Sequence, residues 1–143
     1  MATTAVIDQN IESPVPYLGR LGWATLTAAN TAMDGTGTVA TLITSPTNGC
    51  RPYILKARPL GANVKTVARV FINNGGANST PANNTLWTEI DLPETTASND
   101  EAQADQRADL MGLLILPSGY KINVCIGTAV SAGWQFTCTA GDF

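Results

Sequence analysis

The chain has 143 residues, of which 44% are hydrophobic and only 13% charged, and its formal net charge is −3. This length suits one domain with a sizeable core, and so hydrophobic a composition excludes intrinsic disorder. The basic residues are spread along the chain and no apolar run approaches the ~20 residues of a membrane span, so we expect neither nucleic acid nor membrane as a partner.

Residues 1–21 are expected to form an extended N-terminal arm, followed by a single domain over residues 22–143. Pro14 and Pro16 block regular structure, and the arm carries large apolar residues without a clear period. A frayed terminus is one interpretation, and an arm that orders against a partner is the other. The arm residues expected to contact such a partner are Val6, Ile7, Ile11, Tyr17 and Leu18.

From residue 22 onward, strand patterns alternate with turn signals. Trp23–Ala28 and Arg51–Leu60 each alternate between two faces, and Val39–Thr44 is a β-branched run that ends at a proline and an Asn-Gly pair. These three segments are therefore predicted to be strands.

The clearest pattern lies between Thr66 and Leu92, where two alternating runs flank a polar tract. Such alternation predicts a long antiparallel β-hairpin, with Leu86 on the same face as Ile90 and Leu92. The tract between the strands is longer than a chain reversal needs, and loops of this kind are usually binding surfaces or mobile excursions. The candidate binding residues around this tip are Asn74, Asn78, Asn83 and Trp87.

After the hairpin, residues 94–109 are polar and acidic. Ser98 precedes Glu101 at a capping-box spacing, but the segment lacks the apolar stripe of a buried helix, so we expect a loop that leads into a strand near 105–111. Tyr120–Ile126 alternates cleanly, and a last strand follows with Trp134, Phe136 and Cys138 facing inward. About eight short strands with polar turns predict an all-β antiparallel sandwich, jelly-roll-like.

Residues that carry chemistry are scarce. Histidine is absent, which removes the commonest general base and most catalytic zinc sites, and no nucleophile or phosphate-binding motif is present. Carboxylates such as Glu89 and Asp91 are interpreted as a solvated face, and Asp34-Gly35-Thr36-Gly37 lacks the further acidic positions of a calcium loop. We therefore expect no enzyme activity, no cofactor and no metal.

The three cysteines are Cys50, Cys125 and Cys138, an odd number without the spacing of a zinc site. If the last two strands formed a simple hairpin, Cys125 and Cys138 would lie nearly opposite each other. In a jelly roll they would lie in different sheets. We favour free, buried thiols, and the absence of a visible secretory signal agrees with synthesis in a reducing cytoplasm.

The three tryptophans are assigned different places. Trp23 and Trp134 are expected in the core. Trp87 shares a strand with Glu89 and Asp91, so it is expected to face outward, where it would serve a sugar-binding platform or a protein interface.

Three segments together carry a resemblance to a known class: ANTAMDGTGTVATLIT (29–44), LGANVKTVARVFINNGG (60–76) and LPSGYKINVCIGTAVSAGW (116–134). They resemble small β-proteins encoded in tailed-bacteriophage structural gene clusters, and capsid decoration (cement) proteins with a jelly-roll fold are the nearest class. The resemblance implies a virion protein, made in the bacterial host cytoplasm, that binds the outer surface of an icosahedral head as a homotrimer and bridges subunits of the major capsid protein.

Two alternatives remain beside this expectation. In the first alternative, the chain is a tail, baseplate or head-fibre module that binds host-surface glycan through Trp87 and the 74–84 loop. The other alternative is a small hydrolase that uses carboxylates alone, although no motif marks its active site.

Overall fold

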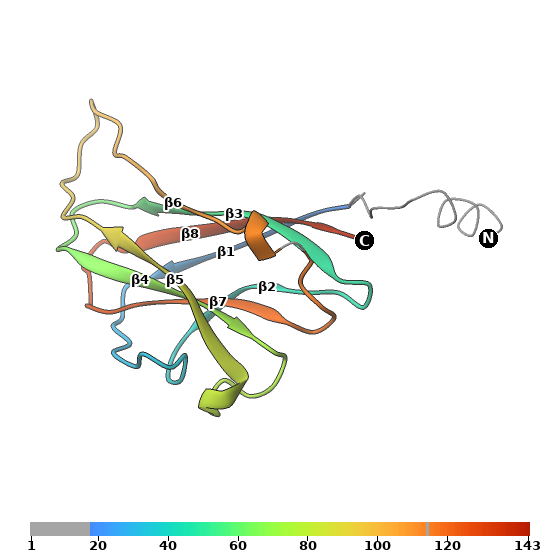
Figure 1. Cartoon of the computed structure of the whole chain (residues 1–143). Coiled ribbons are helices and arrows are strands. Elements are labelled where there is room, and N and C mark those ends of the chain that lie inside the picture. The colour runs from blue at the N-terminus through green and yellow to red at the C-terminus, as the bar shows by residue number, and fades with distance from the viewer. Residues whose placement is uncertain (1–17, 114) are drawn as a thin grey trace.

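Among the residues that the structure describes, eight short strands form two sheets, and the predicted all-β sandwich is confirmed (Figure 1). The computed structural model describes residues 18–113 and 115–143. The strands are β1 (Leu18–Leu26), β2 (Ala40–Thr44), β3 (Cys50–Pro59), β4 (Thr66–Asn73), β5 (Asn84–Leu92), β6 (Gln106–Asp109), β7 (Lys121–Ile126) and β8 (Trp134–Asp142), with 3-10 turns η1 (Pro81–Asn83) and η2 (Met111–Leu113). Sheet A has the order β1-β8-β3-β6, and sheet B has the order β2-β7-β4-β5.

The pairing of the strands is that of a rolled ribbon, which is the jelly-roll arrangement. β1 pairs with β8, β2 with β7, β3 with β6, and β4 with β5, all antiparallel. Further pairing of β3 with β8 and of β4 with β7 completes the two sheets. The rolled ribbon brings distant parts of the chain together, because Leu18 lies opposite Asp142.

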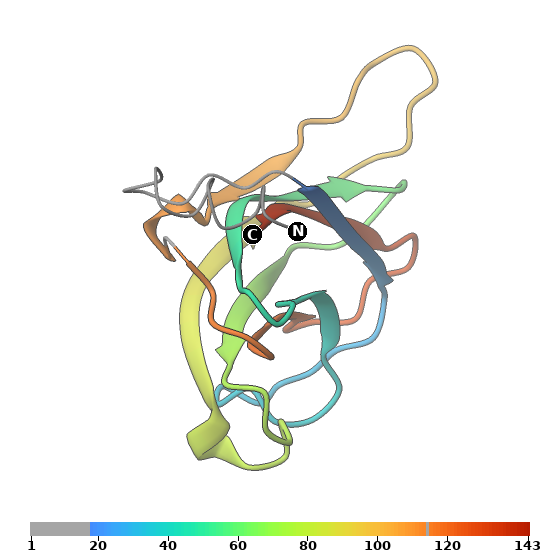
Figure 2. The same ribbon diagram turned by 90° about the vertical axis from the view of Figure 1, so that its right-hand side faces the viewer.

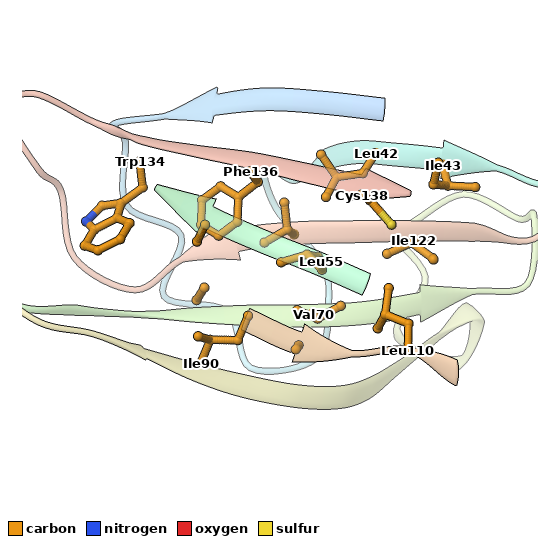
Figure 3. Close-up of a cluster of buried hydrophobic side chains, with 14 of the residues drawn as sticks. Leu42, Ile43, Leu55, Val70, Ile90, Leu110, Ile122, Trp134, Phe136 and Cys138 are labelled. Carbon is orange, nitrogen blue, oxygen red and sulfur yellow. The ribbon is translucent and has the colours of Figure 1, made fainter. Parts of the chain in front are cut away.

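One face of every strand points into the space between the sheets, as period-two alternation predicts. Figure 3 shows side chains of both sheets meeting there. Trp134 and Phe136 of β8 are fully buried in this core, which confirms the inward face predicted for the last strand. The other large, fully buried members of the cluster are Ile43, Leu55, Val70, Leu92, Leu110, Ile122, Val124 and Ile126.

The predicted hairpin is confirmed, with an irregularity at its second strand. β4 and β5 pair from Thr66 opposite Leu92 to Asn73 opposite Asn84, but the register shifts so that Trp87 has no partner. A bulge of this kind changes which face the following side chains occupy. Leu86 was predicted to share a face with Ile90 and Leu92, which are buried. It is instead 40% exposed, because the extra residue interrupts the alternation.

The N-terminal boundary and Trp23 were predicted wrongly. β1 begins at Leu18, so residues 18–21 belong to the sandwich, whereas residues 1–17 lie outside the described residues. Trp23 is 64% exposed and not in the core. The neighbouring Ala24 and Leu26 pack against the core cluster, which directs the odd-numbered side chains of β1 away from it.

The outer face of sheet B is partly buried as well. Phe71 and Cys125 are buried but do not belong to the main core cluster, because they point away from it. The loop before β2 contacts this sheet. The backbone amide of Asn30 donates to the backbone carbonyl of Ile126 (2.7 Å), and the Arg69 guanidinium donates to the backbone carbonyl of Asn30 (3.4 Å). The outer face of sheet B is therefore partly covered at β4 and β7, whereas Glu89 and Asp91 of β5 remain exposed.

Candidate binding surfaces

The tip of the β4–β5 hairpin is held together by asparagine side chains. Nδ2 of Asn74 donates to Oδ1 of Asn83 (3.2 Å), and Nδ2 of Asn83 donates to the Ala77 carbonyl (2.9 Å). Nδ2 of Asn73 donates to Oδ1 of Asn84 (2.8 Å) across the last pair of the ladder. These bonds make the tip an ordered polar turn.

The tip also binds the loop before β2. Both donors of the Asn78 amide point at that loop, to the carbonyls of Gly37 (2.9 Å) and Gly35 (3.4 Å), and the Asn84 amide donates to the Asp34 carbonyl (3.2 Å). The structure thus places Asn74, Asn78 and Asn83 in one turn. Their amide donors already have partners in the chain, which reduces what they can offer to a ligand.

Trp87 lies apart from these asparagines, on the side of the sandwich where β5 and β6 meet. It is 41% exposed, and a Cβ built on Gly112 would lie 3.6 Å from its Cζ2, so the indole lies beside η2. Leu86 precedes it in the chain and Met111 lies in η2, and both are exposed large hydrophobic residues. The predicted outward orientation of Trp87 is confirmed.

The outer face of sheet A is an open surface that the sequence did not reveal. The register places Trp23, Thr137, Lys56 and Arg107 in one row across the four strands. The next row contains Leu21, Thr139, Ile54 and Asp109. Both rows face outward, because their chain neighbours in β8, β3 and β6 are buried in the core. A signal for Trp23 did exist, since it alternates with Ala24 and shares its face with Thr25.

This face is also basic. Four of the eight basic residues lie on the outer side of β3 or β6, namely Arg51, Lys56, Arg58 and Arg107. The Arg51 guanidinium lies 5.9 Å from the centre of the Phe143 ring. Arg107 donates to the Asp105 carboxylate (3.0 Å), and this hydrogen bond, with Lys56 nearby, holds the pKa of Asp105 below its ordinary value.

The acidic segment between β5 and β6 protrudes as a long loop (Figure 2). Oγ of Ser98 accepts hydrogen bonds from the amides of Asp100 (3.2 Å) and Glu101 (3.0 Å), so the predicted cap forms although no helix follows. A hollow of about 410 Å³ lies under the loop, and its lining includes Arg58 and Glu101. The strand predicted near 105–111 is β6.

The carboxylates considered for chemistry form ion pairs or turns. Glu89 pairs with Arg69 (3.0 Å), and Asp91 pairs with Lys65 (3.6 Å). Oδ1 of Asp34 accepts two hydrogen bonds from Thr36, which lower the pKa of Asp34. No group of three or more Cys, Asp or Glu residues within 18–113 and 115–143 has the arrangement of a metal site.

All three cysteines are free and buried, as predicted. Cys125 lies in β7 of sheet B and Cys138 in β8 of sheet A, which settles the two alternatives in favour of separate sheets. Burial raises the pKa of all three thiols, and it raises that of Cys138 to about 12.

We expect the folded protein to resist thiol labelling. Because burial raises the pKa of each thiol, less thiolate is present at pH 8 than in a free cysteine, and burial also blocks access to the sulfur atoms. A colorimetric disulfide reagent should therefore modify the native cysteines far more slowly than the same cysteines in urea. Rapid modification of any one thiol in the native protein would contradict the buried placement.

Among the described residues no helix is long and apolar enough to cross a membrane. The chain matches no family model, no curated protein and no solved structure. The fold assignment therefore rests on the strand pairing itself.

Proposed function

We propose that this protein decorates a tailed-bacteriophage capsid: it binds the major capsid protein on the outer surface of the virion and stabilises the shell. The resemblance of three segments to virion proteins suggests this role. The observation that carries it is the open outer face of sheet A, where Trp23, Leu21 and Ile54 lie beside Lys56 and Thr137. Aromatic residues and arginine are enriched in protein interfaces, and this face presents Trp23 together with Arg107 in one row.

The proposed mechanism is passive attachment at many places. A shell repeats the same contact by symmetry, so each copy needs only a modest affinity, provided that neighbouring copies bridge subunits. The resemblance implies trimers for this purpose. Val6, Ile7, Ile11 and Tyr17 of the arm would add apolar anchoring contacts; they lie outside the described residues, and Leu18 is the first residue of β1.

The test is binding of the full-length protein to undecorated heads. Lys56→Glu should weaken binding at least tenfold, because it reverses a charge at the centre of the proposed face, and Ile7→Asp with Ile11→Asp should weaken it through the arm. Lys65→Glu is the matched control, since this lysine is exposed near sheet B and pairs with Asp91. Bound protein is measured by co-sedimentation with the heads.

Two outcomes would reject parts of the proposal. Unchanged binding of the arm variant removes the arm from the mechanism, and equal binding of Lys56→Glu and Lys65→Glu removes the sheet A face. If the protein does not bind heads but binds a glycan in an array screen, and Trp87→Ala abolishes that binding, the function is recognition of host-surface glycan and not capsid decoration. The partial exposure of Trp87 on its bulge is the observation that supports this alternative.

A further inference from the structure

One lateral side of the sandwich is formed by β1 and β2, and both are terminal strands of their sheets. Within the described residues β1 pairs only with β8, so the backbone groups along its other edge have no strand partner. Figure 2 shows β1, in dark blue, at an outer margin of the molecule. A free sheet edge is a template for another strand.

β6, the other edge strand of sheet A, and β5, the edge strand of sheet B beside it, have features that disfavour pairing with another chain, whereas β1 does not. β6 has only four residues and carries Arg107 and Asp109, and β5 has the bulge at Trp87. β1 has nine residues, keeps one register with β8 throughout and contains no proline. Its only charged residue, Arg20, is turned away to Asp142, with hydrogen bonds of 2.7 and 2.6 Å.

The side chains at the middle of β1 are self-complementary. Leu21 is 57% exposed and Trp23 is 64% exposed, and they flank Gly22, which carries no side chain. In an antiparallel pair about a two-fold axis, the residue at the axis faces its own copy. An axis at Gly22 therefore places Leu21 of each copy opposite Trp23 of the other.

We propose that β1 is a self-association edge, on which β1 of a second copy docks antiparallel with Gly22 at the two-fold axis. Sheet A of one copy then continues into sheet A of the next. Two apolar cross-strand pairs form on the outer face, and unpaired backbone groups of β1 gain partners.

The positions of the basic residues are compatible with this edge-to-edge contact, and they disfavour a dimer in which the outer faces of two copies of sheet A stack. Lys56 lies on β3, so the Lys56 residues of the two copies would be five strand spacings apart, about 24 Å, well beyond the ~8 Å screening length at physiological salt. Stacking two sheet A faces would instead bring like charges to ~10 Å. The second copy therefore fits beside β1 and not on top of the basic face.

The contact differs from the trimer implied by the resemblance and does not depend on capsid binding. The molar mass of the protein in solution, measured without capsids, distinguishes the proposed dimer from the trimer. Light scattering on the full-length protein should give twice the 14.9 kDa monomer mass. Leu21→Lys and Trp23→Lys should each weaken association at least tenfold, because they place like charges beside the axis. Met111→Lys, at a similarly exposed site on the opposite lateral side, should leave the mass unchanged.

A monomer mass up to the highest attainable concentration overturns the proposal, and so does an oligomer that both β1 variants retain while circular dichroism shows them folded. A second measurement tests the register. Leu21→Cys mixed with Trp23→Cys should form an intermolecular disulfide faster than either variant alone, since the two residues face each other across the axis. Faster cross-linking of either variant with itself contradicts the axis at Gly22.

Discussion

Replacing Gly22 by alanine is expected to destabilise the fold by about 3 kcal/mol, the upper end of the usual overpacking penalty. Gly22 lies in β1, and a Cβ built on it would overlap the carbonyl oxygen of Leu42 in β2. The obstacle is backbone and not a flexible side chain, so β1 and β2 would have to move apart. Leu42 is held in place by the bulge of β2, where the register with β7 shifts between Thr41 and Ile43.

The same strand supplies the matched control for this substitution. A Cβ on Gly19 would meet nothing within 4 Å, so Gly19→Ala is expected to stabilise the protein by about 0.4–1 kcal/mol through the unfolded state. Urea unfolding followed by tryptophan fluorescence measures both free energies, because Trp134 passes from the core to solvent when the chain unfolds. A Gly22→Ala variant as stable as the native protein would contradict the close approach of the two strands.

Asn63→Ala is expected to lower the free energy of unfolding by about 2–4 kcal/mol. Asn63 is 3% exposed, and its Oδ1 accepts hydrogen bonds from the amides of Gly133 (2.8 Å) and Ala132 (3.0 Å), while its Nδ2 donates to the Gly133 carbonyl (3.0 Å). Its backbone also exchanges two hydrogen bonds with Thr95. One side chain thus fastens the loop before β8 to the loop before β4, and its removal leaves buried amides without partners.

The same unfolding measurement checks this expectation. Asn99→Ala is the control, because Asn99 is exposed in the loop between β5 and β6, and its substitution should change stability by less than about 0.5 kcal/mol. Equal effects of the two substitutions would show that the Asn63 network contributes nothing to stability.

Period-two alternation was sufficient to predict most strands, because one face of each strand is buried in one core. It located both strands of the Thr66–Leu92 hairpin and the inward face of β8. It failed at Leu86, because a bulge inserts a residue that no local pattern marks. It also placed the start of β1 late, since Leu18–Leu21 acquire their strand from β8, more than a hundred residues away.

The candidate surfaces were less accessible to prediction than the strands. The tip asparagines are recognisable from composition, but their bonds to the loop before β2 depend on the fold. The outer face of sheet A is assembled from four strands, and its basic residues come from two of them, β3 and β6, which are far apart in sequence. Only the register brings Lys56 and Arg107 into the row of Trp23. The combination of aromatic and basic side chains on this face depends on the pairing of the strands and cannot be recognised in any single segment of the sequence.

The rolled ribbon has a consequence for how the protein is made. Arg20 and Asp142, which join the first and last strands, are separated by 122 positions in the chain. At the usual rates of translation, β1 leaves the ribosome on the order of ten seconds before β8 exists to pair with it. Non-local pairing of this kind also folds slowly. β1, whose free edge can pair with another chain, is therefore exposed longer during synthesis than the described strands that follow it. A chain truncated before β8 cannot complete sheet A.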